Sequence, residues 1–539
     1  MQTKWKLGAA LILGAFIPGG IAADAEIKAV TIDDCVQQAL QKNLDIRIER
    51  INPQLARLSV SGSYSVYEPT FTASVDHSFN SSPGSVDAQG RQYPSSERDT
   101  DSVTFGLNGY LPSGMTYSIG ASMADTTVPS TSYLLDPLTP PSYTTNYLNV
   151  VLPGPPMVYN GQMQVLTPIA TIPTTSIYEN STAFVGIQMT QPLLKNFWID
   201  SARLAITLRK KDLKISELAL EARLMKTVSD VQVAYYDLIS AEENVKVQEK
   251  ALQLAEQLLK ENQTRVRVGV LAPLDEKQAE SEVAARRADL TSVRNVLQVR
   301  QNALKRLLTD DFAAMQDIQF KPSENLASSV QVFSRQDSWH KGLTMRPELL
   351  EARLGLEKQN ISIKYLKNQI FPQLDLKGSY GRNGSSREFS GAFAGVADGG
   401  SPAYSYGVVL TVPLGERQNR VNLRSAKATL EQQLLTLKRL ELQIMADIDD
   451  AVVTAQSSLE RVDATRKAVQ FAEAALEAEQ KKLDNGKSTS FQVLQFQRDL
   501  TSRRSEVIRA LTDYNTSLVR LSESEGSTLQ RSGIKIELK

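Results

Sequence analysis

Hydrophobic and polar positions alternate along this chain with two different periods. Segments 202–268 and 418–485 contain neither proline nor glycine, and over 216–259 apolar residues recur every two to four positions with charged residues between them. This period predicts helices, each about 100 Å long at about 1.5 Å per residue. Each helix ends at a glycine turn, from which a second helical run returns. The sequence therefore predicts long helical hairpins over 202–308 and 418–522, which favour a tube or a rod over an ordinary globular domain.

The second period is two, and it predicts short β-strands. Apolar and polar residues alternate over 70–79, over 182–190 and in two runs within 372–412. Strands of about ten residues alternate in this way in outer-membrane barrels, apolar outside and polar inside. The strands of a soluble sandwich alternate too, so the pattern leaves both open. Four strands are too few for a barrel, which usually needs about eight. Either the strands pack on something else or several chains contribute to one barrel.

The elements follow the same order twice along the chain. Each half has a short helix, two strands, a long helix, a turn and a return helix, and Gly269 at the first turn is echoed by Gly486 at the second. Internal repeats of this kind set the architecture. The sequence predicts one structural repeat over 26–325, a second over 326–523 and a C-terminal tail over 524–539. The interleaving of strands and helices favours one elongated unit over a string of separate domains.

The first repeat carries an insert over 80–181. Within it, apolar residues alternate over 102–123 around a Pro112-Ser113-Gly114 turn, which predicts a β-hairpin. The following segment, 124–181, is rich in proline, threonine, serine and tyrosine and predicts a long outer loop. The strand directions allow the hairpin to join a barrel of six strands per chain. Because the second repeat has only two strands, the repeat favours the alternative, an extracellular cap above four barrel strands.

The N-terminus predicts export from the cytoplasm. Two lysines precede an apolar stretch over 7–17, and small residues follow, so residues 1–25 have the pattern of a cleaved signal peptide. The apolar stretch is too short for a transmembrane helix. The one cysteine, Cys35, stands well beyond the apolar stretch inside an expected helix. It therefore predicts a small buried residue rather than a lipid anchor.

Composition and motifs exclude several classes of function. The 60 basic residues balance 60 acidic ones, which argues against a nucleic-acid partner. The two histidines, His77 and His340, have no metal-ligand spacing. The sequence contains no nucleophile elbow, P-loop or dinucleotide fingerprint. We therefore expect no enzymatic activity, no metal and no cofactor.

Several motifs, taken in order, resemble those of the TolC-like outer-membrane efflux proteins, the outer membrane factors. They are the entry helix after Thr31, the Gln191-Pro192-Leu193 strand end, the Val268-Gly269-Val270 turn with Asp275, and Arg346-Pro347-Glu348-Leu349. The resemblance implies a mixed α and β fold in which long antiparallel hairpins of a homotrimer form a periplasmic α-barrel tunnel. This tunnel joins a shared, twelve-stranded transmembrane β-barrel in the outer membrane.

The resemblance also implies a function. Such a protein is the outer-membrane exit duct of a tripartite efflux or type I secretion system. It passively conducts substrates to the exterior from a periplasmic adaptor and an inner-membrane pump. Two other classes remain as alternatives. A periplasmic adaptor would need a single hairpin flanked by lipoyl-like β-domains, and a surface fibre would need strict heptads without barrel strands.

The resemblance puts the functional residues at the two hairpin turns. The surface that docks the adaptor would comprise Val268, Gly269, Val270, Asn485, Gly486, Lys487 and Thr489. The entrance gate would include Asp275, whose family counterpart pairs with the second turn. It would also include Gln492 and Gln495, where a well-known member has a ring of carboxylates. The aromatic and arginine partners of the family lock are replaced by Leu483 and Ser488, so this lock departs from the family pattern.

The same turn residues also have purely structural interpretations. Asp275 follows Pro273 and is equally suited to cap the return helix. Gly269 and Gly486 are expected to adopt the positive φ that ends a helix.

Overall fold

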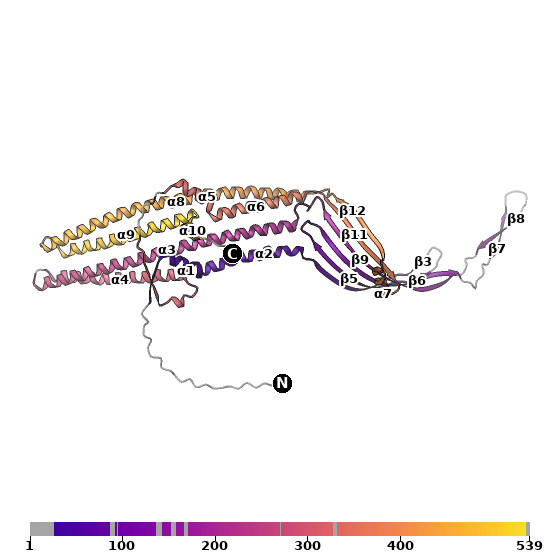
Figure 1. The fold of residues 1–539 in the computed structure, drawn as a ribbon, viewed down its shortest axis with the longest axis horizontal. Coiled ribbons are helices and arrows are strands. Elements are labelled where there is room, and N and C mark those ends of the chain that lie inside the picture. Colours follow the sequence, from indigo (N-terminus) through magenta and orange to yellow (C-terminus); the bar gives the residue numbers. More distant parts are fainter. Residues whose placement is uncertain are drawn as a thin grey trace, which may run out of the picture. The chain divides into compact units, whose positions relative to one another are not determined.

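The computed structural model describes residues 26–86, 92–93, 95–135, 143–151, 158–166, 171–269, 271–326, 331 and 333–534. The predicted signal peptide and Val270 lie outside these ranges. The chain divides into two compact units, which are described separately (Figure 1). The helical unit comprises Met1–Val60, Arg209–Asn360 and Ala428–Lys539, and the sheet unit comprises Ser61–Leu208 and Ile361–Lys427.

Two helical hairpins supply most of the helical unit. The first consists of α3 (Ser201–Arg267) and α4 (Pro273–Leu308), and the second consists of α8 (Arg417–Asp484) and α9 (Ser490–Ser524). These helices occupy the ranges that the apolar period predicts. Because α3 and α8 contain no glycine or proline, nothing in their sequence interrupts the backbone hydrogen bonds over their 67 and 68 residues.

Shorter elements open each half of the chain. The first half begins with β1 (Glu26–Val30), α1 (Ile32–Lys42) and α2 (Leu44–Ser63), and the second with α5 (Arg335–Met345) and α6 (Pro347–Asn368). Strand β10 (Ile318–Pro322) pairs with β1 in parallel, η2 (Ala313–Met315) precedes it, and α10 (Thr528–Arg531) follows α9. A capping box between Thr31 and Asp34 starts α1.

A hydrophobic core joins α1, α3, α4, β1 and β10. The predicted stripe on α3 is buried there, at Leu220, Leu224, Val228, Val231, Tyr235, Leu238 and Ile239. The Tyr235 hydroxyl donates a hydrogen bond of 3.0 Å to the Val30 carbonyl. Cys35 is 1% exposed in this core, and burial raises the pKa of its thiol to about 12. The interpretation of Cys35 as a small buried residue is therefore confirmed.

The sheet unit is built around a six-stranded antiparallel sheet. Its spatial order is β12-β11-β9-β6-β5-β2, with each neighbouring pair antiparallel. The strands are β2 (Thr70–Ser82), β5 (Ser96–Tyr110), β6 (Thr116–Leu135), β9 (Thr171–Pro192), β11 (Gln373–Ser386) and β12 (Ser401–Thr411). The 3-10 turn η1 (Tyr64–Tyr67) precedes β2, and the short helix α7 (Phe389–Ala397) connects β11 to β12.

The structure corrects two expectations for the insert. First, the predicted hairpin over 102–123 lies within the sheet as β5 and β6, between β2 and β9. The hairpin is therefore not folded apart from the other strands, as a separate cap would be, because the inserted strands complete the backbone ladder between β2 and β9. Second, the segment over 124–181 is not simply a loop, since β6 and β9 remain paired from Thr116↔Thr190 to Leu135↔Thr171.

The prolines of this segment explain why its sequence predicted a loop rather than the paired strands β6 and β9. Pro129 lies in β6 and Pro173 in β9, and a two-stranded ribbon tolerates proline because each strand has an open edge. Two further ribbons pair β3 with β4 and β7 with β8. Their bounds are Ser85–Val86, Gln92–Tyr93, Tyr143–Val151 and Val158–Leu166.

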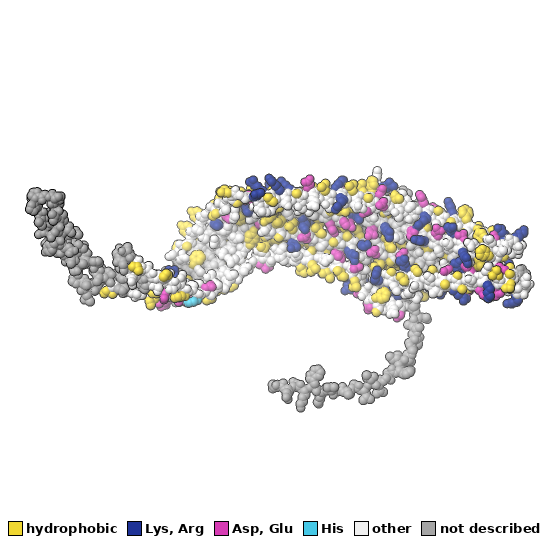
Figure 2. Space-filling view, turned by 180° about the vertical axis from the view of Figure 1, so that it is seen from behind, with side chains coloured by type: hydrophobic (Ala, Val, Ile, Leu, Met, Phe, Trp, Pro, Cys, Tyr) yellow, Lys and Arg dark blue, Asp and Glu magenta, His cyan; other side chains and the backbone are white. Residues whose placement is uncertain are grey.

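Charge is distributed differently over the surfaces of the two units. Lysine, arginine, aspartate and glutamate side chains of both signs are interspersed over the helical unit, whereas the visible surface of the sheet unit carries few of them (Figure 2). None of the helices in the described ranges is long and apolar enough to cross a membrane.

A buried glutamine fastens α4 to β10 and provides a test of this packing. Gln301 Nε2 donates to the Phe320 carbonyl at 2.6 Å, and Gln301 Oε1 accepts from the Phe320 amide at 3.0 Å. We expect Gln301→Met to lower the free energy of unfolding by roughly 2–4 kcal/mol, because two buried backbone groups lose their partner. The control is Gln298→Met, at an exposed position of the same helix. Urea unfolding followed by circular dichroism should separate the two variants, and equal midpoints would contradict the proposed role.

Candidate functional site: the paired turns of the helical hairpins

Both hairpin turns depend on a glycine with positive φ. Gly269 has φ of 79° and donates to the Val266 carbonyl at 3.0 Å, and Gly486 has φ of 70° and donates to the Leu483 carbonyl at 3.0 Å. A Cβ at either position would meet no atom within 4 Å. The backbone conformation, rather than space, therefore requires glycine, and the predicted positive φ is confirmed at both turns.

Other predicted residues shape the second turn. Thr489 caps α9 by accepting a hydrogen bond from the Gln492 amide at 3.3 Å. Asn485 Nδ2 donates to the Lys481 carbonyl at 2.7 Å, and the Lys487 amide donates to the Lys482 carbonyl at 2.9 Å. These bonds satisfy backbone groups that a helix end leaves open.

Apolar side chains are exposed at both turns. Val268 is 67% exposed and Leu274, the second residue of α4, is 66% exposed. On the other hairpin, Phe491 is 53% exposed at the start of α9. Leu274 and Phe491 are absent from the predicted docking set, although each lies next to a residue that marks a helix start in the sequence.

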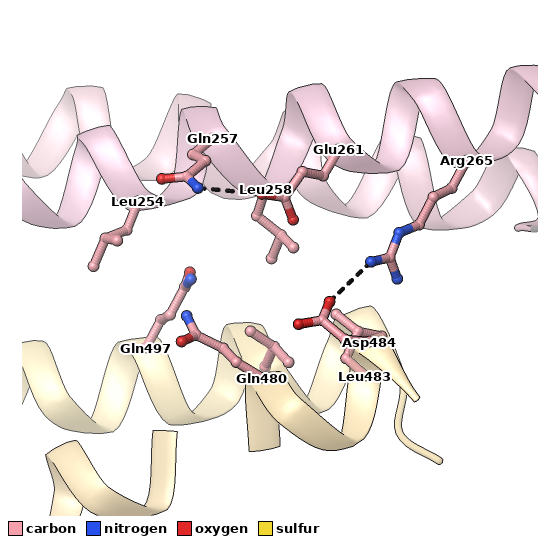
Figure 3. Close-up of a pocket in the computed structure, with 10 residues that line it drawn as sticks. Leu254, Gln257, Leu258, Glu261, Arg265, Gln480, Leu483, Asp484 and Gln497 are labelled. Atoms are coloured by element: carbon pink, nitrogen blue, oxygen red, sulfur yellow. Dashed lines mark hydrogen bonds and ion pairs between the residues drawn. The ribbon is translucent and has the colours of Figure 1, made fainter. Parts of the chain in front are cut away.

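Asp275 serves as a cap for its own helix. Its carboxylate accepts a hydrogen bond of 3.3 Å from the Ala272 amide, and Pro273 occupies the first helical position. This is the structural alternative to its predicted role in the gate. Across the two turns, Arg265 at the end of α3 forms an ion pair with Asp484 at the end of α8, at 3.1 Å. Figure 3 shows these two side chains pointing toward one another.

Buried contacts reinforce this ion pair. Ser490 Oγ donates to Asn262 Oδ1 at 3.0 Å, and these residues are 1% and 0% exposed. Leu258 of α3 joins a hydrophobic cluster with Leu483 of α8 and Val493 of α9. Leu483, where the family resemblance predicts an aromatic residue, thus contributes apolar packing to the junction of the hairpins. Ser488, where the resemblance predicts an arginine, donates to Glu479 within its own hairpin.

A second ion pair joins α4 to α9. Glu282 is 3% exposed and accepts hydrogen bonds from Arg498 Nε at 2.9 Å and from Arg286 Nε at 2.8 Å. Burial alone would raise the pKa of Glu282, but the bonds from the two arginines outweigh it and hold the pKa below its usual value. The carboxylate is therefore ionised at neutral pH, and the pairing is lost only as the pH falls through this lowered pKa.

Beside the Arg265–Asp484 pair the hairpins border an open hollow of about 400 Å³ (Figure 3). Its wall includes Leu254, Gln257 and Glu261 of α3 and Gln480 of α8, together with Gln497 of α9. Polar groups line much of this space, so the hairpins meet through a small number of contacts rather than through a continuous apolar seam.

Comparison with known proteins identifies the family. A family model described as outer membrane efflux protein matches residues 173–309 and 340–527, more than half of the chain. The chain belongs to the outer membrane efflux protein family. It is 27% identical over 314 residues to outer membrane protein OprJ of Pseudomonas aeruginosa, a match that covers 58% of this chain and 63% of OprJ. The chain thus spans just under two thirds of this relative, and the predicted resemblance to TolC-like proteins is confirmed.

Solved structures share the fold of this efflux-family protein. The outer membrane protein VceC of Vibrio cholerae aligns with a TM-score of 0.58 at 17% identity, over 92% of this chain and 96% of VceC. The CmeC outer membrane channel of Campylobacter jejuni aligns with a TM-score of 0.56 at 15% identity, over 92% of this chain and 86% of CmeC.

The residues that join the turns differ from the predicted gate residues. Gln492 and Gln495 are exposed on one face of α9 and face away from the buried cluster, so their place in a gate remains a prediction. The missed pairs, Arg265–Asp484 and Glu282–Arg498, are 219 and 216 residues apart. This is close to the spacing of the two turn glycines. Opposite charges at equivalent positions of the two repeats were therefore the signal that could have identified them.

The Glu282–Arg498 pair gives a test of how the hairpins are held. We expect Glu282→Gln to loosen the junction, because hydrogen bonds to charged groups contribute roughly 1.5–3 kcal/mol. The reporter is Ser490→Cys in a Cys35→Ser background, since Ser490 is buried between the hairpins. Maleimide should label this cysteine about tenfold faster in the Glu282→Gln variant, a ratio equivalent to about 1.4 kcal/mol.

The matched control is Glu280→Gln on the same helix. Glu280 pairs only locally with Lys277 at 2.7 Å, on the exposed surface, so its substitution should leave the labelling rate unchanged. Equal labelling rates in both variants would show that the buried pair does not hold the hairpins together.

Proposed function

We propose that this protein is the outer-membrane exit duct of a tripartite efflux or type I secretion system. It passively conducts substrates to the exterior from a periplasmic adaptor and an inner-membrane pump. The observation that carries this proposal is that one chain of the outer membrane efflux family combines two helical hairpins, joined near their turns, with a six-stranded antiparallel sheet. The second hairpin argues against an adaptor, and the six-stranded sheet argues against a fibre.

An exposed apolar stripe on α2 supports assembly into a homotrimer. Its members are each at least half exposed and alternate in spacing between four and three residues: Leu44, Ile48, Ile51, Leu55 and Leu58. This is the spacing of a coiled-coil seam, which packs against another helix. Because no element in the described part of the chain covers the stripe, a second copy is the natural occupant. Three copies close the tunnel, as the family resemblance implies.

In this assembly the two units lie in different compartments. The sheet unit forms a β-barrel in the outer membrane, and the helical unit extends into the periplasm after removal of the signal peptide. The hairpin turns then face the adaptor. Their exposed apolar side chains, Val268, Leu274 and Phe491, supply the docking contacts, and the turn glycines and the caps at Asn485 and Thr489 set the shape of that surface.

The junction between the hairpins acts as the gate of this duct. Docking of the adaptor would separate α3 from α8 and α4 from α9, at the expense of the Arg265–Asp484 and Glu282–Arg498 pairs. Gln492 and Gln495 line the entrance in place of a carboxylate ring. Neutral amides attract cations weakly, so multivalent cations should block this entrance less than they block an acidic one.

Assembly state is the direct test of the proposed function. Native mass measurement of the detergent-extracted protein should give three copies of the chain. We expect Ile51→Glu to reduce the trimer fraction severalfold, since it would bury an unpaired charge in the α2 seam. The control is Asn52→Glu, which adds the same charge at the neighbouring position outside the stripe. A wild-type protein that is a uniform monomer would refute the proposal, and equal trimer fractions in both variants would refute the α2 seam.

A further inference from the structure

We propose that the sheet closes edge to edge with copies of itself and that each chain contributes all six strands to the barrel. A trimer then has eighteen strands, rather than the twelve that the family resemblance implies. This inference rests on the trimer of the proposed function. The surface that it identifies is the pair of free sheet edges, β2 and β12, and the partner of each edge is the opposite edge of a second copy of this chain.

One apolar row crosses all six strands without interruption. The registers place side by side Phe71, Leu107, Ile119, Ile187, Tyr380 and Tyr404. Several of these side chains are widely exposed, including Phe71 at 66% and Tyr404 at 71%. The inserted strands β5 and β6 contribute to the row in the same way as their neighbours. An extracellular cap surrounded by water would gain nothing from such an exposed row.

The next row, on the opposite face, contains small and polar residues. It consists of Thr72, Gly106, Gly120, Gly186, Gly381 and Ala403. The Phe184 ring lies over two of these glycines, where a Cβ at Gly186 or Gly381 would come within 2.5 Å of it. A second row on this face is polar throughout and consists of Thr70, Asn108, Ser118, Gln188, Ser379 and Ser405. The sheet therefore has one apolar face and one face of small and polar residues across its full width, as the wall of a membrane barrel requires.

Two edges of the sheet lack a partner within the described part of the chain. Strand β2 pairs with β5 alone, and β12 pairs with β11 alone. All of β2 is exposed, and nearly all of β12. Backbone groups in hydrocarbon must be paired, and an open edge is not tolerated there. Six strands cannot close alone, since about eight are needed, so another chain must cover both edges.

The directions of the edge strands fit a second copy. An even number of antiparallel strands makes β2 and β12 run in opposite directions. When β12 of one copy lies beside β2 of the next, the new pair is therefore antiparallel like every other pair in the sheet. The contact joins two different edges, so it repeats from copy to copy and closes into a ring.

The turn of the inserted hairpin, between β5 and β6, lies at the end of the sheet where β9 ends. The Ser113 carbonyl in its turn accepts a hydrogen bond of 3.2 Å from Gln191 Nε2, near the end of β9. Strands β5 and β6 contain 15 and 20 residues, more than the roughly 9–11 that cross a bilayer. The hairpin can thus span the membrane alongside β9. Barrels of about 16–18 strands enclose an aqueous channel, so this wall surrounds a wider pore than twelve strands would.

Cysteine labelling on adjacent residues of β6 tests the inference. Ser118→Cys and Ile119→Cys, each in a Cys35→Ser background and in lipid nanodiscs, are treated with a water-soluble maleimide and with a bilayer-soluble one. We expect Ser118→Cys to react at least tenfold faster with the water-soluble reagent than Ile119→Cys, which should react with the bilayer-soluble reagent. The cross-strand partners on β9, Gln188→Cys and Ile187→Cys, provide the matched controls.

The outcomes separate this inference from the proposed function. Alternating reactivity on both β6 and β9 supports a six-stranded contribution. If β9 alternates but both β6 cysteines react equally with the water-soluble reagent, the hairpin lies outside the membrane and the inference is overturned, while a trimer in native mass measurement leaves the proposed function intact. If neither strand alternates, the sheet is not a membrane wall and both fail.

Discussion

An open sheet with one apolar face is the constraint on which the rest of this molecule depends. Such a sheet cannot be stable in water with its apolar row exposed, and it cannot lie in hydrocarbon with its edges unpaired. The described part of the chain supplies one six-stranded sheet and two long helical hairpins, and neither the sheet nor the hairpins close on themselves. The exposed seam on α2 is the helical counterpart of the open sheet edges. In the proposed trimer, association with further copies would cover both surfaces at once, and folding would be coupled to assembly.

The junction of the hairpins follows a different rule. Long helices could be joined by a continuous apolar seam, but near the turns they meet through a small cluster around Leu258, one buried polar pair and two ion pairs. Arg498 is 51% exposed in its pair with Glu282, so solvent weakens this contact. A junction of this kind suits the proposed gate, in which the hairpins stay together until the adaptor docks and separates them.

The sequence predicted the order and ranges of the helices well, but it predicted poorly which strands and which side chains pair with one another. Helix ranges followed from the absence of breakers and from the apolar period, and the turn glycines followed from their position between two helical runs. The number of strands in the sheet could not be predicted in this way. The repeat suggested two strands per half, whereas β5 and β6 insert between β2 and β9. Proline in β6 and β9 disguised their length. The ion pair of Glu282 with Arg498 joins residues 216 positions apart, so local patterns could not reveal it, and only a comparison of charges at equivalent positions of the two repeats could have done so.

Single-channel recording in planar bilayers tests the central claim, that fastened hairpin turns close a passive duct. The account predicts a small conductance for the wild-type protein. It predicts a severalfold larger one for the Arg265→Ala, Arg498→Ala double variant, in which both ion pairs between the hairpins are lost. The control is Arg287→Ala, which removes a pair with Glu256 within one hairpin and should leave the conductance unchanged. A double variant that conducts no better than the wild type would contradict the account.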